Sequence, residues 1–339
     1  MTVGPRAGSA CVPRTAFLLS VLSVCLLSAA CTPKTPPPVE KITIAVPTLP
    51  HSGLFFVAKE KGYFREEGLE VVVVPTMYGK LALDELIADK ADFALSGETP
   101  VMFAVLRGES VFVVADLMNS VKDEAIVARK DRGIVSPSDL KGRTVGVSAG
   151  TTAEYFLDIF LTVHAVPRTS LRLVHLRPDE MGDALRVGKV DAVAIWNPHV
   201  IALGKEFGGK AVTFYGDTIY TASFSLMTKK AYATEHPEAV KRLLRSLLKA
   251  EEFVHRTPEE TLDIVARSLR MDKAELESVL PVYDFRLRLG TALLVNLENQ
   301  ARWAIRNRLS DRKEIPNFLD FFYLDGLKAV KPDAVTVSR

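Results

Sequence analysis

Residues 142–161 place a short strand, a glycine turn and the start of a helix in direct succession. Residues 143–147 form a β-branched run that is typical of a buried strand. Thr151 then begins an amphipathic segment, and Glu154 follows three residues later, which is the spacing of a capping box. A helix that starts in this way presents free backbone N–H groups and the positive end of its dipole to polar ligands. One such unit is common in α/β proteins, so its meaning depends on how often the chain repeats it.

The same strand–turn–helix arrangement occurs four times. Alternating strands and helices up to about residue 227, followed by helices from residue 237 onward, predict an α/β protein with mostly parallel sheets. In open α/β sheets, ligands bind beyond the carboxyl ends of the strands, where these turns lie. If two lobes faced each other, all four helix N-termini could converge on one ligand. The four turns are Ser52-Gly53, Gly97-Glu98-Thr99, Gly150-Thr151-Thr152 and Asn197-Pro198-His199.

Two local patterns give more detailed expectations. Thr99 and Asn197 each precede a proline, which predicts a helix N-cap with proline at the first helical position. Residues 70–74 are nearly all β-branched, and such a run is typical of a strand that is buried on both faces.

Composition narrows the function. The chain has 43 basic and 41 acidic residues in 339, a formal net charge of only +2. This balance gives no electrostatic reason to expect nucleic acid as a partner. Its three cysteines are Cys11, Cys25 and Cys31, which leaves no cysteine for a disulfide, a thiolate nucleophile or a metal site beyond residue 31. The six histidines show no metal-ligand spacing. We therefore expect neither a metal nor another cofactor, and no catalytic residue.

The N-terminus has the features of an export signal. Arg6 and Arg14 precede the apolar residues 16–30, a stretch too short for a typical membrane span, so residues 1–30 are predicted to be a signal peptide. Residues 27–31 (LSAAC) resemble the lipobox of bacterial lipoproteins, in which Cys31 would be the lipidated first residue of the mature protein. Serine at position 28 departs from the usual aliphatic residue, so cleavage without lipidation stays open. Residues 31–40 are then a lipid-anchor cysteine and a proline-rich tether.

Several longer motifs carry a family resemblance. They are His51-Ser52-Gly53-Leu54-Phe55, residues 58–64 (AKEKGYF), Asp92-Phe93-Ala94, Leu140-Lys141-Gly142, residues 150–157 (GTTAEYFL) and residues 190–199 (VDAVAIWNPH). With these motifs the chain resembles the periplasmic solute-binding proteins of ABC importers for nitrate, sulfonates, taurine and thiamine-pyrimidine precursors.

This resemblance implies a two-lobed periplasmic-binding-protein fold of type 2, in which two mixed sheets flanked by helices are joined by two crossing segments. Lobe 1 would comprise residues 41–124 and 226–339, and lobe 2 residues 125–225. It also implies a monomer in the periplasm or at the cell surface, anchored in the membrane only through Cys31. Such a protein would close on a small solute without changing it and deliver it to the permease subunits of the importer.

The resemblance also implies which residues face the cleft between the lobes. Trp196 and Tyr220 would be its walls, and Glu98 would select among solutes. None of the four turns contains Arg or Lys, which favours an amine-bearing or heterocyclic solute, taurine-like or aminopyrimidine-like, over nitrate or a simple sulfonate. The implied ligand-binding residues are His51, Ser52, Gly97, Glu98, Thr99, Asn119, Thr151, Thr152, Trp196, Asn197, Asp217 and Tyr220.

Two other functions remain open at this stage. Enzymes related to this group include a synthase of the thiamine pyrimidine, which carries a Cys-rich motif, and cytoplasmic lyases of the menaquinone pathway. The absence of cysteine beyond residue 31 and the export signal argue against both. A lipoprotein sensor domain that presents its solute to a membrane kinase would need the same cleft, so the sequence does not separate it from a transport protein.

Overall fold

The computed structural model describes residues 1–5, 8, 39–216 and 219–337. The chain divides into two units, Met1–Pro38 and Val39–Arg339, and the fold described below belongs to the second unit. The predicted signal peptide, the lipidation site Cys31 and most of the tether lie outside the described residues, as does Asp217. No helix within the described part of the chain has the length and apolar character needed to cross a bilayer.

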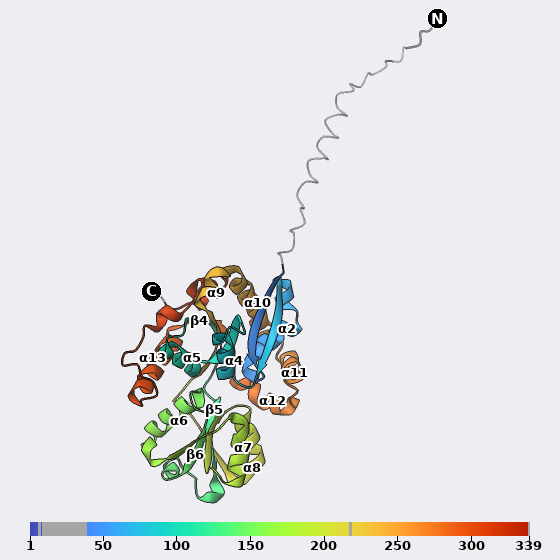
Figure 1. The fold of residues 1–339 in the computed structure, drawn as a ribbon. Coiled ribbons are helices and arrows are strands. Elements are labelled where there is room, and N and C mark those ends of the chain that lie inside the picture. Colours follow the sequence, from blue (N-terminus) through green and yellow to red (C-terminus); the bar gives the residue numbers. More distant parts are fainter. Residues whose placement is uncertain (6–7, 9–38, 217–218, 338–339) are drawn as a thin grey trace. The chain divides into compact units, whose positions relative to one another are not determined.

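The first sheet has six strands in the order β11-β4-β10-β3-β1-β2. Both ends of the second unit contribute to it, because β10 and β11 come from the later part of the chain (Figure 1). Its strands are β1 (Glu40–Pro47), β2 (Leu69–Thr76), β3 (Phe93–Gly97), β4 (Val111–Ser120), β10 (Ala222–Lys229) and β11 (Asp284–Arg288).

The second sheet has five strands in the order β7-β6-β8-β5-β9 and is built from the middle of the chain. The chain enters it after β4 and leaves it before β10. Its strands are β5 (Glu124–Arg129), β6 (Thr144–Val147), β7 (Arg172–His175), β8 (Ala192–Trp196) and β9 (Ala211–Tyr215).

Both sheets are mixed, and most of their strands run in one direction. In the first sheet β2, β1 and β3 are parallel, and β4 has the same direction because β10 pairs antiparallel with both β3 and β4. In the second sheet β7, β6 and β8 are parallel, and the antiparallel β5 separates β8 from β9. The predicted fold, two mixed and mostly parallel sheets joined by two crossings, is confirmed. The exact lobe boundaries at residues 125 and 226 stay a prediction.

Helices flank each sheet and bury its apolar side chains. The first sheet belongs to one large hydrophobic cluster, whereas the second has a separate cluster on each face. In Figure 1, α6, α7 and α8 surround the green second sheet. The helices of that sheet are α6 (Thr152–Val163), α7 (Pro178–Val187) and α8 (His199–Phe207). The remaining helices are α2 (Gly53–Glu60), α3 (Tyr63–Glu66), α4 (Gly79–Ile87), α5 (Glu98–Arg107), α9 (Lys230–Glu235), α10 (Pro237–Arg256), α11 (Pro258–Leu269), α12 (Lys273–Val279), α13 (Thr291–Arg306) and α14 (Leu324–Val330).

The structure corrects several local expectations. β2 is the edge strand of the first sheet and is partly exposed along its length, so it is not buried on both faces. The N-cap of α5 is Gly97 rather than Thr99, and the N-cap of α8 is Pro198 rather than Asn197. β9 and β11 were not predicted from the sequence; both are short strands at sheet edges.

A close backbone approach at Gly79 allows a prediction about stability. A Cβ atom at this position would lie 3.0 Å from the backbone nitrogen of Gly97 and 3.0 Å from the Cα of Ser96, so neither neighbour can give way by rotating a side chain. We expect Gly79→Ala to lower the free energy of unfolding by about 1–3 kcal/mol, as measured by urea denaturation. The matched control is Gly182→Ala within α7, where the nearest atom is the side-chain Cδ2 of Leu203 at 3.4 Å. At Gly182, alanine has a better helix propensity than glycine by roughly 0.5–1 kcal/mol. If Gly182→Ala lowered the free energy of unfolding as much as Gly79→Ala does, the prediction would be contradicted.

Candidate functional site

One cavity is lined by residues that come from both sheets. It holds about 430 Å³ of space between protein atoms, its open mouth included. The lining residues are Leu49, His51, Tyr78, Gly79, Lys80, Gly97, Pro100, Met118, Asp123, Glu124, Thr151, Thr152, Trp196, Ala222, Ser223 and Phe224.

Two of the four predicted turns line the cavity directly, and the other two reach it through the residue just before the turn, His51 and Trp196. His51 comes from the 3-10 turn Pro50–Ser52 ahead of α2, and Gly97 is the N-cap of α5. Thr151 is the N-cap of α6, and Trp196 is the last residue of β8. The turns converge because each follows a strand end, and the two sheets bring those strand ends to one space. Five of the twelve predicted site residues thus line the cavity: His51, Gly97, Thr151, Thr152 and Trp196. Whether they contact a ligand stays a prediction.

Asp123 is the centre of a buried hydrogen-bond network in the crossing between β4 and β5. Its Oδ2 lies 2.7 Å from Nε2 of His51, and its Oδ1 accepts a hydrogen bond of 2.9 Å from the hydroxyl of Tyr283. Its backbone carbonyl accepts from the N–H of Asn197 at 3.1 Å. The His51 ring also packs against Tyr283 and Phe224, with centroids 5.0 and 5.3 Å apart. This network fixes the His51 ring, and a His51 that donates from Nε2 to the Asp123 carboxylate keeps Nδ1 as an acceptor.

Glu124 follows directly and lies opposite Trp196 in the antiparallel pairing of β5 with β8. Both side chains line the cavity. Only 3% of Glu124 is exposed, and its Oε1 has no hydrogen-bond partner among the described residues. Burial raises the pKa of the Glu124 carboxyl well above its usual value, and the neighbouring charges of Asp123 and Glu98 raise it further. The sequence-based prediction included neither Asp123 nor Glu124.

Glu98 lies behind the cavity wall rather than in it. Its side chain is fully buried and accepts from the backbone N–H of Ser223 at 3.0 Å, from Nε2 of Gln300 at 3.1 Å and from the hydroxyl of Tyr220. Burial raises the pKa of Glu98 to about 8, although the hydrogen bonds from Ser223 and Gln300 oppose this shift. These contacts join the start of α5 to the return crossing and to α13. A direct role of Glu98 in solute selection stays a prediction.

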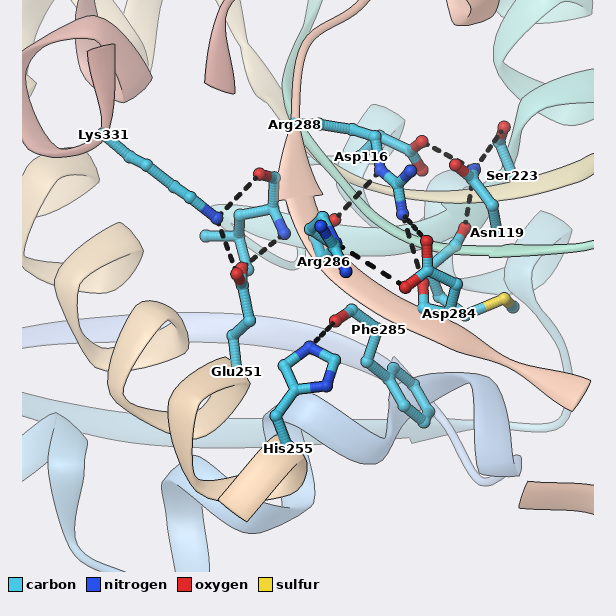
Figure 2. Close-up of polar contacts among 12 residues, drawn as sticks. Asp116, Asn119, Ser223, Glu251, His255, Asp284, Phe285, Arg286, Arg288 and Lys331 are labelled. Carbon is cyan, nitrogen blue, oxygen red and sulfur yellow. Dashed lines mark hydrogen bonds and ion pairs between the residues drawn. The ribbon is translucent and has the colours of Figure 1, made fainter. Parts of the chain in front are cut away.

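Five other predicted site residues do not line the cavity, and most of their polar groups have protein partners. The hydroxyl of Ser52 donates to the carbonyl of Pro47 at 2.9 Å. Asn119 donates from Nδ2 to Oδ2 of Asp116 at 2.7 Å and to the hydroxyl of Ser223 at 2.9 Å (Figure 2). Asn197 donates from Nδ2 to the carbonyl of Lys122, and the Tyr220 hydroxyl donates to Glu98. In contrast, the hydroxyl of Thr99 is buried and has no partner within the described chain.

The predicted capping box at the start of α6 takes a different form. Thr151 is the N-cap, but its hydroxyl donates to the carbonyl of Ser148 at 2.7 Å instead of accepting from the first turn. The Glu154 carboxylate accepts from the N–H of Gly150 at 2.8 Å and pairs with Arg168 at 3.1 Å. Glu154 therefore orders the turn that presents Thr151 and does not line the cavity.

The chemistry that this lining allows is binding by hydrogen bonds, charge and aromatic contact. Lys80 is the single ammonium or guanidinium side chain among the lining residues, and it pairs with Asp84 at 3.1 Å. Across residues 39–216 and 219–337, no group of three or more His, Cys, Asp or Glu side chains is arranged to hold a metal ion.

Comparisons with known proteins agree with this architecture. The family described as "NMT1/THI5 like" matches residues 50–261. The chain is similar to a putative aliphatic sulfonates-binding protein of Bacillus subtilis, with 29% identity over 66% of this chain and 69% of that protein. Its fold is similar to two crystal structures. The sulphonate-binding protein SsuA of Escherichia coli has a TM-score of 0.73 and 19% identity, covering 84% of this chain and 98% of SsuA. SsuA of Xanthomonas axonopodis pv. citri, bound to MOPS, has a TM-score of 0.74 and 20% identity, covering 84% and 99%. Because the family match spans more than half of its residues, the chain belongs to the NMT1/THI5-like family.

Proposed function

We propose that this protein is an extracytoplasmic solute-binding protein of an ABC importer, which captures one small organic solute and passes it to the permease. The observation that carries this proposal is a cavity lined from both sheets, at the predicted turns before α5 and α6 and at the residues just before the other two turns. A site lined from two sheets can close around a solute when the two parts approach each other, and hinge closure of this kind is common among periplasmic binding proteins. The sulfonate-binding relatives support the same general role.

The proposal includes the location and partners of the protein. The basic and apolar N-terminal residues support export, and the lipobox-like residues 27–31 support a lipid anchor at Cys31. A tethered monomer would then deliver its solute to the membrane subunits of the importer. A sensor domain that reports to a membrane kinase is the alternative that uses the same cavity.

We further propose that the solute is bound without chemical change. All three cysteines precede residue 32, so the cavity has no thiolate nucleophile. The Asp123–His51 pair resembles the orienting half of a catalytic triad. Two threonine hydroxyls line the cavity, but that of Thr151 donates to the carbonyl of Ser148 and that of Thr152 hydrogen-bonds the Glu124 carboxyl.

A binding panel tests the proposed function. The purified full-length chain would be titrated with taurine, ethanesulfonate, nitrate, benzenesulfonate, benzamidine and agmatine, with thermal unfolding and calorimetry as readouts. A solute that binds only the folded protein stabilises it by about 2.7 kcal/mol at a hundred times its dissociation constant, so the melting temperature should rise with solute concentration. We expect at least one of the six to bind with one-to-one stoichiometry. Failure of all six to shift the melting temperature or to release heat would contradict the proposed function.

A further inference from the structure

Three polar groups in the cavity lining lack a hydrogen-bond partner within the described chain. They are Oε1 of Glu124, Nε1 of Trp196 and Nδ1 of His51, in side chains that are 3%, 6% and 5% exposed. Buried polar atoms in native proteins are almost always paired, and each one left unpaired costs roughly 1–3 kcal/mol. Three such atoms around one cavity are available as partners for a bound ligand.

The chemistry of these atoms defines what that ligand must present. An ionised Glu124 accepts hydrogen bonds, and in a neutral His51 ring that donates from Nε2 to Asp123, Nδ1 is also an acceptor. Nε1 of Trp196 only donates. Because Glu124 and Trp196 are directly opposite each other on β5 and β8, one acceptor and one donor lie side by side. A matching solute therefore carries N–H donors next to an acceptor or an aromatic surface.

The charges around the cavity favour a cation over an anion. Asp123 and Glu124 both line it, whereas the ammonium of Lys80 is already paired with Asp84. Repulsion from Asp123 is one reason why the pKa of Glu124 is raised, and a cation beside it would favour the ionised form again. A sulfonate in the same place would add negative charge to a buried site whose carboxylates already repel each other. The indole of Trp196 can in addition stabilise a cation over its face.

We propose that the solute presents a cationic nitrogen, as an amine, amidine or guanidine, to Glu124, with His51 as a second acceptor and Trp196 as the adjacent donor and wall. This inference rests on the proposed function, because it names the class of solute that the same cavity takes. It also differs from the naming of the relatives, which are described as sulfonate-binding proteins. In this proposal the specificity depends on two carboxylates, Asp123 just before β5 and Glu124 at its first residue.

Benzamidine and benzenesulfonate provide a matched test, because they share a ring and differ in the charge of the attached group. We expect the full-length chain to bind benzamidine at least ten-fold more tightly than benzenesulfonate. Glu124→Gln keeps the shape of the side chain but removes its charge. A charged hydrogen bond is worth about ten- to hundred-fold in affinity, so benzamidine binding should weaken by that factor while benzenesulfonate binding stays equal or improves.

Two further variants keep the result interpretable. Glu251→Gln is the matched control, because Glu251 on α10 is also a largely buried carboxylate. Glu251 accepts from Lys331 at 2.6 Å (Figure 2) and from the N–H of Leu287 at 2.6 Å. It does not line the cavity. The Glu251→Gln substitution should leave the affinity for benzamidine unchanged. Trp196→Phe retains an aromatic wall but removes the N–H, so we expect its affinity for benzamidine to fall a few-fold. This variant tests the proposal independently of whether Glu124→Gln folds.

The outcomes separate this inference from the proposed function. Tighter binding of benzenesulfonate than of benzamidine would overturn the cationic class while leaving solute binding intact. Benzamidine binding that Glu124→Gln leaves unchanged would overturn the role of Glu124. Failure of the whole six-compound panel would contradict the proposed function and this inference together.

Discussion

Glu98→Gln is expected to abolish the loss of stability that the wild type shows between pH 5 and pH 8. Glu98 is fully buried, and burial raises its pKa from 4.5 to about 8. The folded protein therefore holds this carboxyl protonated at neutral pH. Glutamine matches the acid in size but has only one acceptor oxygen, whereas both oxygens of Glu98 accept hydrogen bonds, so the substitution should carry a pH-independent cost of roughly 1–3 kcal/mol.

The direction of the pH effect follows from proton linkage. Below pH 4.5 Glu98 is protonated in both the folded and the unfolded chain. Its titration then contributes nothing to the difference in stability between the wild type and Glu98→Gln. Between pH 4.5 and about 8 the unfolded chain loses this proton while the folded chain keeps it, so the wild type loses stability as the pH rises. Each pH unit in this window is worth about 1.4 kcal/mol, which makes the whole effect of the order of several kcal/mol. Above pH 8 the difference in the free energy of unfolding between the two proteins should become constant.

Urea denaturation of both proteins at pH 5.5, 6.5, 7.5 and 8.5 measures this difference. Glu67→Gln is a suitable control, because its pKa is lowered rather than raised. Partial burial of Glu67 acts to raise the pKa, but hydrogen bonds and charge from Lys249 and Arg245 outweigh it. A carboxyl with a lowered pKa contributes stability above its unfolded pKa, so Glu67→Gln should cost a nearly constant amount over these four pH values. Parallel profiles for the wild type and Glu98→Gln would show that Glu98 is ionised in the folded protein.

The contacts of Glu98 give a reason for a buried carboxyl that lowers the stability of the folded protein at neutral pH. Its partners Tyr220 and Ser223 belong to the segment that returns from the second sheet, and Gln300 belongs to α13. A single carboxyl thus ties the start of α5 to the return crossing and to a helix near the C-terminus. In a protein that closes by hinge motion, this tie would position the strand that carries Ser223 into the cavity lining.

Much of the fold was predictable from the sequence because turn chemistry repeats in it. Alternating strands and glycine- or proline-containing turns are local signals, and they located two turns that line the cavity and two that lie directly beside lining residues. The burial of β2 was less predictable. Its run of valines is typical of a central strand, yet β2 pairs only with β1 and forms the sheet edge. Composition reports how apolar a strand is, whereas its place in a sheet depends on the order in which distant strands pair. β11 was missed for the same reason, since charged residues alternate through it.

The candidate site was only partly predictable, and the missed residues share one cause. Asp123 and Glu124 are adjacent acids in front of a strand, which is an ordinary sequence for a solvent-exposed turn. Their burial results from contacts with His51, Tyr283 and Trp196, which lie 72 or more residues away in the chain. Glu98, in contrast, was predicted as a cleft residue, but the sequence did not reveal that Tyr220, Ser223 and Gln300 use its oxygens. Long-range partners decide whether a polar residue is free to bind a ligand.

Asp123→Asn is expected to turn Nδ1 of His51, on one side of the cavity, from a hydrogen-bond acceptor into a donor. The Asp123 carboxylate accepts from both His51 and Tyr283. An asparagine offers one acceptor and one donor, so it cannot serve two donors. His51 can resolve the conflict by moving its proton to Nδ1, which then becomes a donor on an atom that has no partner within the described residues. Benzamidine affinity should then fall about ten-fold or more, while benzenesulfonate affinity should rise.

Stability changes distinguish this effect from simple disruption of the network. Asp123→Asn should lower the free energy of unfolding by roughly 1–3 kcal/mol, the usual cost of an imperfectly paired buried group. Asp123→Ala should cost about 3–5 kcal/mol, because it leaves both partners unpaired and buried. Tyr283→Phe is the matched control: it removes the other hydrogen bond to Asp123 but keeps the carboxylate that His51 needs.

Nitrogen NMR of the His51 ring decides between two explanations of the altered binding. In the wild type and in Tyr283→Phe we expect the neutral ring to carry its proton on Nε2, and in Asp123→Asn on Nδ1. The preference for benzamidine should follow the tautomer, and so persist in Tyr283→Phe. An Asp123→Asn protein that keeps the Nε2 proton yet loses benzamidine binding would show that Asp123 acts through its charge alone. The orientation of His51 would then matter for the fold of the cavity and not for which solute it selects.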